Sequence, residues 1–210
     1  MNLSNARLYL VLDTAVRGYD ELFDIMKVAV QSGVDVVQLR DKQGSARDIF
    51  NFSRRALGYL KKKVPFIIND RVDLVLASQA DGVHLGQDDL PVATARKILG
   101  KKAIIGASCQ TLAHAVAARK AEADYIGFGS VFKTLTKPDR QAMDLRLFSA
   151  VVKKSRLPVF AIGGIDLENV RTIFAAGGRR VAVTRALCLA GDCRAAARNL
   201  RKTIDAVMRE

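Results

Sequence analysis

Three polar residues alternate at the end of one apolar run, and their types suit the binding of a phosphorylated ligand. The run is VDVVQLRDK, in which Gln38, Arg40 and Lys42 stand two residues apart. On an extended strand this spacing sends all three side chains to one face. Two cations and an amide there can chelate a phosphate or diphosphate, because Arg offers a planar fork of donors and Lys a point charge. The alternative is an ion pair of Arg40 or Lys42 with Asp41 or with an outer helix.

Acidic residues follow the next two apolar runs. The first run leads into Asn69 and Asp70, and the second into the neighbouring acids Asp88 and Asp89. Carboxylates beside a diphosphate site indicate Mg²⁺, which usually takes one or two protein carboxylates and completes its octahedron with water and phosphate oxygens. Asp70 is then a metal ligand, and the Asn69 amide donates a hydrogen bond to the phosphate. The alternative for Asp70 and Asp88 is to cap the helices that follow them.

Two later strand ends carry groups that suit a second anion. Gly163 and Gly164 come just before a helical segment, so their backbone amides are exposed where the positive end of the helix dipole attracts anions. Thr184 and Arg185 end the last apolar run. Glycines that only permit close packing are the alternative. Together these residues predict a site for one phosphomonoester.

A serine and a long polar loop complete the set. Ser108 follows the fifth apolar run and can donate to a phosphate, although turn formation explains it equally well. The loop at 127–138 carries Thr134, Thr136 and Lys137 and is long enough to close over a substrate. Lys137 is a candidate for balancing the charge of a leaving pyrophosphate. No His-Asp pair accompanies Ser108 at the strand ends, so the sequence gives no reason to expect a side-chain nucleophile.

The elements that must position these residues alternate along the chain. Short runs rich in β-branched residues occur at 8–12, 34–39, 66–68, 82–85, 103–106, 125–128, 158–162 and 181–183, with helical segments such as 111–121 and 167–176 between them. Eight such units predict a (β/α)8 TIM barrel, whose active site forms at the carboxyl ends of the strands. A doubly wound open sheet is the second choice, but no glycine-rich dinucleotide fingerprint follows the first run.

Composition limits the class of protein. The 210 residues suffice for a single domain over 1–210 with one sizeable core, and neither a membrane span nor a signal peptide is expected, so a cytoplasmic location is predicted. The net charge of +13 raises the question of nucleic acid, but with 6% aromatic residues and no recognised motif we expect no nucleic-acid partner. Small-molecule substrates are expected instead. The three cysteines have no metal-ligand spacing, and a homo-oligomer is compatible with a sequence that does not fix the oligomeric state.

With these residues assembled, the chain resembles the thiamine phosphate synthases across nearly its whole length. The matching segments are QLRDK, IINDRVDL, ADGVHLGQDD, YIGFGSVFKTLTK and AIGGI, in the order and close to the spacing of that family. The resemblance implies a (β/α)8 barrel that joins hydroxymethylpyrimidine diphosphate to thiazole phosphate with Mg²⁺, releasing pyrophosphate. It also implies a dissociative mechanism, in which diphosphate departs before the thiazole nitrogen attacks.

The resemblance assigns a role to each candidate. It implies that the diphosphate is held by Gln38, Arg40, Lys42, Asn69 and Lys137, with Ser108 beside it, and that Mg²⁺ is carried by Asp70 and Asp89. Asp89 is preferred to Asp88 because it matches the second acid of the family's G-Q-[DE]-D. Thr134 and Thr136 are expected beside the thiazole, and Gly164, Thr184 and Arg185 around its phosphate.

Three places depart from the family pattern. Gln110 stands where the family usually has histidine, and GGRRVAV, with Arg179 and Arg180, replaces the usual GADGVAV before the last strand. Arg185 stands where the synthases often have serine. The thiazole tautomerases are the main rival within the fold, and they use a histidine near Gln110 for proton transfer, so its absence argues against them. A non-catalytic phosphate sensor has no need to keep Asp70 and Asp89 on adjacent loops. A nucleic-acid-binding barrel predicts an affinity that falls steeply with salt.

Overall fold

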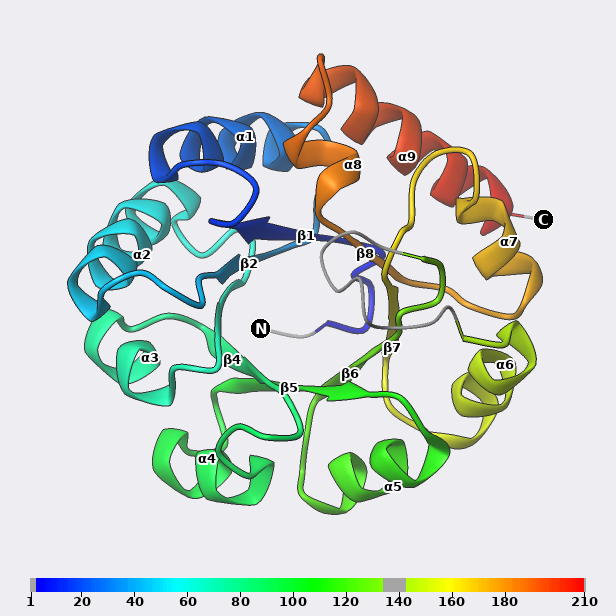
Figure 1. The fold of residues 1–210 in the computed structure, drawn as a ribbon, viewed down its shortest axis with the longest axis horizontal. Coiled ribbons are helices and arrows are strands. Elements are labelled where there is room, and N and C mark those ends of the chain that lie inside the picture. The colour runs from blue at the N-terminus through cyan, green and yellow to red at the C-terminus, as the bar shows by residue number, and fades with distance from the viewer. Residues whose placement is uncertain (1–2, 134–142, 210) are drawn as a thin grey trace.

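The computed structural model describes residues 3–133 and 143–209, and the described chain forms a closed barrel of parallel strands (Figure 1). The strands follow one another around the ring in sequence order, and the last, β8, pairs with the first, β1. They are β1 Leu8–Asp13, β2 Val36–Arg40, β3 Phe66–Asn69, β4 Gly82–Leu85, β5 Ile104–Cys109, β6 Tyr125–Phe128, β7 Val159–Ile162 and β8 Val181–Val183. The predicted (β/α)8 barrel is therefore confirmed, and the open sheet is wrong.

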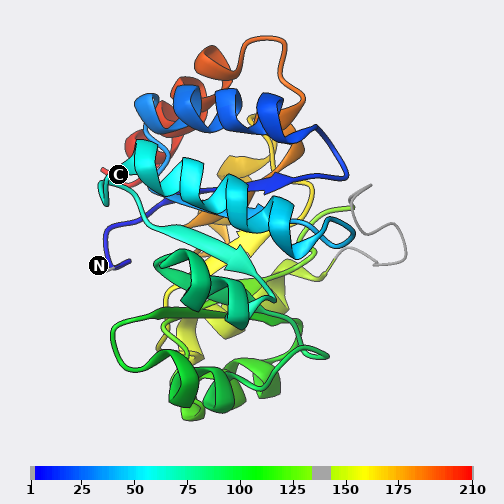
Figure 2. The same ribbon diagram turned by 90° about the vertical axis from the view of Figure 1, so that its left-hand side faces the viewer.

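Helices cover the outside of the ring. They are α1 Tyr19–Gln31, α2 Ala46–Leu60, α3 Val72–Ser78, α4 Val92–Leu99, α5 Leu112–Lys120, α6 Leu145–Lys154, α7 Val170–Ala175, α8 Arg185–Cys188 and α9 Cys193–Val207. Seen from the side, α1 to α4 follow one another along the barrel wall (Figure 2). This cover buries both faces of the strands, which is why the strands are nearly continuous apolar runs.

Several helices begin where the sequence supplies a cap. The side chains of Ser45, Thr111, Asp144 and Asp192 each accept a hydrogen bond from a backbone amide in the first turn of the helix that follows. Such caps satisfy amides that otherwise lack a partner at a helix start. They fix where each connecting loop ends and the helix begins.

Two apolar clusters hold the barrel. The larger lies between the strands and the helices and includes Leu10, Phe66 and Phe148. The smaller fills the barrel interior, where Tyr9, Tyr125 and Phe160 pack with aliphatic side chains. Leu3 and Ala6 of the N-terminal segment belong to this inner cluster, so the chain start closes the amino end of the barrel.

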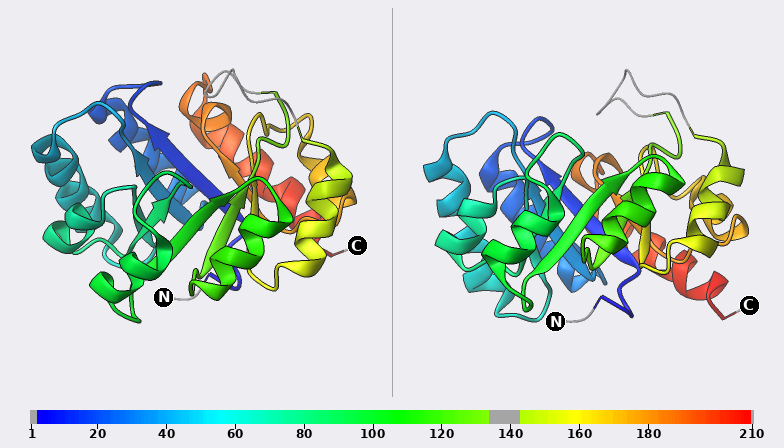
Figure 3. Two further views of the ribbon diagram at one scale, coloured as in Figure 1. Left: turned by 60° about the horizontal axis from the view of Figure 1, so that its bottom comes forward. Right: turned by 90° about the horizontal axis from the view of Figure 1, so that it is seen from below.

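The two ends of the barrel therefore differ. The N-terminal residues lie at one end of the barrel. Helix α8 and the loops that follow the strands lie at the opposite end (Figure 3). The closed end leaves the carboxyl ends of the strands as the place for a cavity. No helix among residues 3–133 and 143–209 is both long and apolar enough to cross a membrane.

Candidate active site

A cavity of about 380 Å³ opens at the carboxyl ends of the strands. The predicted residues that line it are Gln38, Arg40, Asn69, Ser108, Gly164, Thr184 and Arg185. They come from β2, β3 and β5, from the loop after β7, and from the start of α8, which directly follows β8. The cavity thus brings together groups from five different regions of the chain, as expected for the carboxyl ends of the strands. Gln110 does not line it.

Two of the three alternating residues line the cavity, namely Gln38 and Arg40 of β2. Lys42 lies two residues beyond that strand and outside the cavity lining, and its ammonium contacts the Asp70 carboxylate. Arg40 Nη1 lies 2.7 Å from Asp13 Oδ2. Pairing of these cations with Asp41 is therefore wrong for both. The Asp41 carboxylate accepts instead from the Tyr19 hydroxyl and from backbone amides of its own loop.

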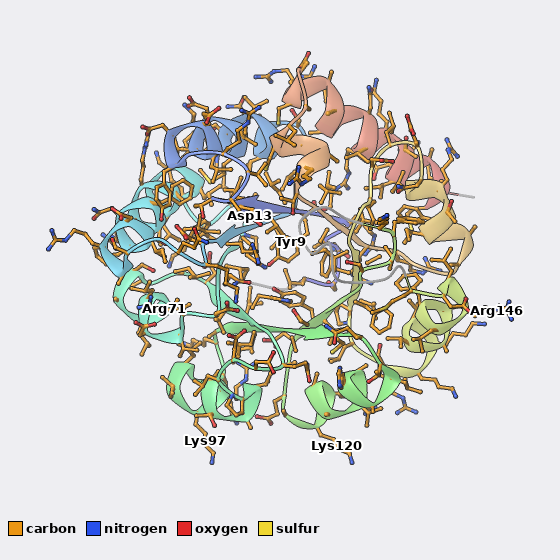
Figure 4. The ribbon with its side chains drawn as sticks, in the orientation of Figure 1. Tyr9, Asp13, Arg71, Lys97, Lys120 and Arg146 are labelled. Carbon is orange, nitrogen blue, oxygen red and sulfur yellow. The ribbon has the colours of Figure 1, made fainter. Side chains whose placement is uncertain are left out.

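Asp13 is a cavity residue that our sequence prediction missed. It lies opposite Arg40 in the register of β1 and β2, its second carboxylate oxygen accepts from the Ala15 amide at 3.0 Å, and it is only 1% exposed. Figure 4 shows it inside the ring of strands, while labelled residues such as Lys97 and Lys120 lie on the outer helices. A first strand one residue longer than predicted would have identified it, because Asp13 is the polar residue at that strand end.

The acidic residues after β3 and β4 meet beside the cavity without lining it. Asp70 is hydrogen-bonded to Asp89 and contacts the Lys42 ammonium, while Asp89 Oδ2 accepts from the Gly86 amide at 2.7 Å. Asp70 has a left-handed backbone, with φ 62°. Few residues other than glycine adopt this conformation, and where they do it often marks a functional site. The neighbouring Asp88 is exposed.

The capping interpretation of these acids is wrong. The N-cap residue of α3 is Arg71 and that of α4 is Pro91, and neither helix start receives a side-chain hydrogen bond. Asp70 therefore directs its carboxylate at Lys42 and Asp89 and not at the start of α3. Helix capping therefore does not explain the presence of Asp70 at this position, and a role in binding is the remaining interpretation.

Burial and hydrogen bonding push the pKa values of the two carboxyls apart. Burial raises the pKa of Asp70, and its hydrogen bond with Asp89 adds to the rise against the opposing effect of Lys42. Burial also acts to raise the pKa of Asp89, but the hydrogen bonds from Asp70 and from the Gly86 amide outweigh it and lower that pKa. Two carboxyls held next to each other form a place that a divalent cation can occupy.

Asn69 has a buried donor directed into this region. Its side chain is 8% exposed and lines the cavity, and its Nδ2 atom has no hydrogen-bond partner among the described residues. A buried amide without a partner is costly, so such a group is usually satisfied by a ligand or water. Asn69 is therefore suited to donate to an oxygen of a bound anion.

A buried chain of hydrogen bonds crosses the floor of the cavity. Gln38 Nε2 donates to Tyr9 Oη at 2.7 Å, and the hydroxyls of Tyr9 and Tyr125 lie 2.9 Å apart. His84 then connects Tyr125 Oη to Ser108 Oγ, at 3.0 Å from each through its two ring nitrogens. Burial raises the pKa of both tyrosines, so their hydroxyls stay protonated. His84 is thus a hydrogen-bonded strand residue that links Tyr125 to Ser108.

The opposite side of the cavity is built from the loops after β7 and β8. Gly164 has φ 65°, and a Cβ there would lie 2.4 Å from the Lys133 carbonyl oxygen, so only glycine fits. Gly163 and Thr184 line the same side. Arg185 and Lys133 also line it, and Arg185 Nε is buried with no partner in the described structure. Lys133 was not predicted, because in the sequence it is one of two lysines in a polar loop.

Thr134, Thr136 and Lys137 lie outside the described residues. The loop that carries them leaves β6 beside the cavity, since Ser130 and Lys133 both line it. Their roles stay predictions from the resemblance.

Comparison with known proteins decides the family. The family model of thiamine monophosphate synthase matches residues 8–187. The chain belongs to the thiamine monophosphate synthase family. It is therefore an enzyme of the transferase class, and the resemblance seen in the sequence is confirmed.

Relatives agree with this family over most of the chain. The thiamine-phosphate synthase of Clostridium novyi is 39% identical over 198 residues, which span 93% of this chain and 97% of that protein. That of Albidiferax ferrireducens is 41% identical and spans 99% and 95%. The solved thiamine phosphate pyrophosphorylase of Pyrococcus furiosus superposes with a TM-score of 0.88 at 33% identity, covering 97% of each chain.

Proposed function

We propose that this chain joins 4-amino-2-methyl-5-hydroxymethylpyrimidine diphosphate to 4-methyl-5-(2-phosphoethyl)thiazole, giving thiamine phosphate and pyrophosphate. Family membership gives the reaction class. The observation that carries the substrate assignment is the meeting of two separate cationic groups at opposite sides of one cavity. Arg40 with Asn69 lines one side, and Arg185 with Lys133 lines the other. A reaction between two phosphorylated molecules needs two such places.

The β2 and β3 side would hold the diphosphate. Arg40 is fixed by Asp13 at 2.7 Å, which holds the guanidinium at the cavity wall. Asn69 supplies an unpartnered amide donor, and Lys42 a further positive charge. By resemblance, Lys137 would join them. Cations placed around a leaving group stabilise the negative charge that accumulates on it as its bond breaks.

The acids suit Mg²⁺. Across residues 3–133 and 143–209 no three of His, Cys, Asp and Glu gather as a complete protein-ligated metal site would require. Asp70 is hydrogen-bonded to Asp89 beside the Lys42 ammonium, and one or two carboxylates are what Mg²⁺ takes from a protein when phosphate oxygens complete its shell. Held there by Asp70 and Asp89, Mg²⁺ would supply positive charge to neutralise the diphosphate.

The β7 and β8 side would hold the thiazole phosphate. Gly163 and Gly164 keep the backbone close to the cavity, and Arg185 offers a cation with a buried, unpartnered Nε among the described residues. This matches the usual phosphate site of the fold. Thr134 and Thr136 would lie beside the thiazole ring. The phosphate would thereby be fixed at a distance from the diphosphate, with both rings between them.

The proposed bond changes are dissociative. The bond from the pyrimidine methylene carbon to the diphosphate oxygen breaks, and its electron pair leaves with pyrophosphate. The thiazole nitrogen then donates its lone pair to the resulting pyrimidine methyl cation. No side chain forms a covalent bond in this scheme, which agrees with the lack of an activated nucleophile: burial raises the pKa of the nearby Cys109 thiol to about 12.

Omission experiments test the proposal. Purified protein is given both substrates and Mg²⁺, and pyrophosphate is measured with each component left out in turn. We expect release only when all three are present. Release without the thiazole phosphate would indicate a hydrolase, and no release by folded protein would favour the tautomerase or a ligand-binding relative.

The order of bond changes has its own test. With ¹⁸O in the bridging position of the pyrimidine diphosphate, reversible bond breaking moves the label to non-bridging positions. Scrambling in recovered substrate is expected for a dissociative step, with an unreactive thiazole analogue completing the site. Turnover without scrambling in the recovered substrate under any condition would argue for direct attack.

A further inference from the structure

The hydrogen-bond chain on the cavity floor ends at Ser108, which lines the cavity. It runs from Gln38 through Tyr9, Tyr125 and His84 to Ser108, and its links are 2.7, 2.9, 3.0 and 3.0 Å long. Its members come from β1, β2, β4, β5 and β6. Ser108 stands at the cavity wall, so whatever the chain fixes at that residue is presented to a ligand.

The chain has a direction, because it starts at the Gln38 amide nitrogen, an atom that can only donate. The Gln38 amide nitrogen donates to Tyr9 Oη, which leaves the single Tyr9 hydroxyl proton for Tyr125 Oη. The Tyr125 proton is then directed at His84 Nδ1. If Tyr125 Oη donated to Tyr9 Oη instead, Tyr9 Oη would accept from both Gln38 and Tyr125. The Tyr9 hydroxyl proton would then lack an acceptor among the described contacts, although the residue is buried.

Two glycines leave room for these rings. A Cβ on Gly106 would lie 2.1 Å from the ring of Tyr125, and one on Gly127 would lie 3.1 Å from Cε1 of His84. Gly106 faces His84 in one neighbouring strand and Tyr125 in the other. Strand positions without side chains therefore let the two rings meet inside the barrel, and the contact is built into the strand register.

We propose that His84 is a positioning residue that sets the hydrogen bonding of Ser108. With Nδ1 accepting from Tyr125, the neutral imidazole carries its proton on Nε2 and donates it to Ser108 Oγ. The Ser108 oxygen is thereby used as an acceptor, and its own proton turns into the cavity. Ser108 then offers a fixed donor to an acceptor atom of the ligand.

This inference deepens the proposed function and its kinetic consequence rests on it. A donor fixed in the free enzyme costs no reorganisation when charge develops on the ligand. On the proposed reaction the acceptor would be an oxygen of the departing diphosphate, whose charge grows as its bond breaks. The hydrogen bond should then strengthen in the transition state and appear in kcat more than in KM.

The tautomer of His84 can be observed without any substrate. The chain has two histidines, so His114→Gln, on the outer helix α5, leaves His84 as the single histidine for ¹⁵N labelling. At pH 8 we expect Nε2 to show the pyrrole-like shift of a protonated nitrogen and Nδ1 the pyridine-like shift. Tyr125→Phe should abolish this preference. A proton on Nδ1, or an equal mixture in the otherwise unaltered protein, would overturn the proposal whether or not the chain makes thiamine phosphate.

Two substitutions of His84 then distinguish a role in positioning Ser108 from a role in packing. His84→Gln keeps a donor that reaches Ser108, whereas His84→Asn reaches only the place of Nδ1. We expect His84→Asn and Ser108→Ala each to lower kcat about tenfold, the loss of one hydrogen bond, with no further loss when combined. His84→Gln should stay within about threefold of the parent. Additive losses in the double variant, or equal losses in Gln and Asn variants, would show that His84 does not act through Ser108.

Discussion

The ion pair between Asp13 and Arg40 gives the sharpest test of how the cavity is built. The Asp13 side chain is 2% exposed and that of Arg40 18%, with 2.7 Å between Oδ2 and Nη1. Asp13→Asn keeps the shape but removes the charge, which leaves the guanidinium without its partner. Breaking a buried pair from one side costs 3 to 5 kcal/mol, and Arg40 keeps some contact with solvent, so we expect about 3 kcal/mol. At this chain length that lowers Tm by about 6 to 12 °C.

The same substitution should weaken binding of one substrate only. Without Asp13, the Arg40 fork is no longer held toward the diphosphate, and we expect KM for the pyrimidine diphosphate to rise about tenfold, the contribution of one charged hydrogen bond. KM for the thiazole phosphate should stay unchanged, because Gly164 and Arg185 lie on the other side of the cavity. Steady-state kinetics with each substrate varied in turn measures both values.

A matched control lies at the other end of the same strand. Asp35, just before β2, pairs with Arg201 at 2.8 Å, and these side chains are 26% and 29% exposed. Asp35→Asn should lower Tm while leaving both KM values unchanged, since this pair is far from the cavity in the register of β2. A parental KM in Asp13→Asn, or a raised KM in Asp35→Asn as well, would refute the role assigned to Asp13.

Three further outcomes follow from the structure. Asp70→Asn should lower kcat by at least about 100-fold, because it removes one of two adjacent carboxylates. It should not lower Tm, because asparagine tolerates the left-handed backbone. A variant with parental activity would show that Asp70 is not needed for catalysis. Gly164→Ala should raise KM for the thiazole phosphate at least about tenfold and lower Tm, since its Cβ would lie 2.4 Å from the Lys133 carbonyl oxygen. Parental kinetics would show that a Cβ is tolerated at this position. Burial raises the pKa of Cys109 and Cys188 to about 12, so at pH 8 only about one thiol in 10⁴ is ionised. Iodoacetamide should therefore modify neither cysteine until the protein unfolds, which mass spectrometry can measure. Rapid labelling of the folded protein would contradict their burial.

The strands could be predicted because each is a short β-branched run between polar segments. Three of them, 82–85, 125–128 and 181–183, have the predicted bounds, while β5 runs three residues further than its apolar core. Its extension through Ala107, Ser108 and Cys109 depends on hydrogen bonds to β4 and β6, which no local pattern reveals. Strand existence is thus a local property, and strand length a tertiary one.

The partners of the charged residues could not be predicted. Alternation predicts that Gln38 and Arg40 share a face, but the contacts of Arg40 with Asp13 and of Lys42 with Asp70 depend on how β1, β2 and β3 are staggered. The left-handed backbone of Asp70 turns its carboxylate away from α3, and nothing in the sequence indicates it. The hydrogen-bond partners of Tyr9 could not be predicted either, because they come from β2 and β6.

A single-turnover measurement shows whether this cavity joins the two phosphorylated substrates. With enzyme in excess over both substrates and Mg²⁺ present, thiamine phosphate and pyrophosphate are quantified in the same quenched samples. We expect the two products to appear in equal amounts and at the same rate. Pyrophosphate without thiamine phosphate, or neither product from folded protein, would contradict the claim that this cavity joins the two phosphorylated substrates.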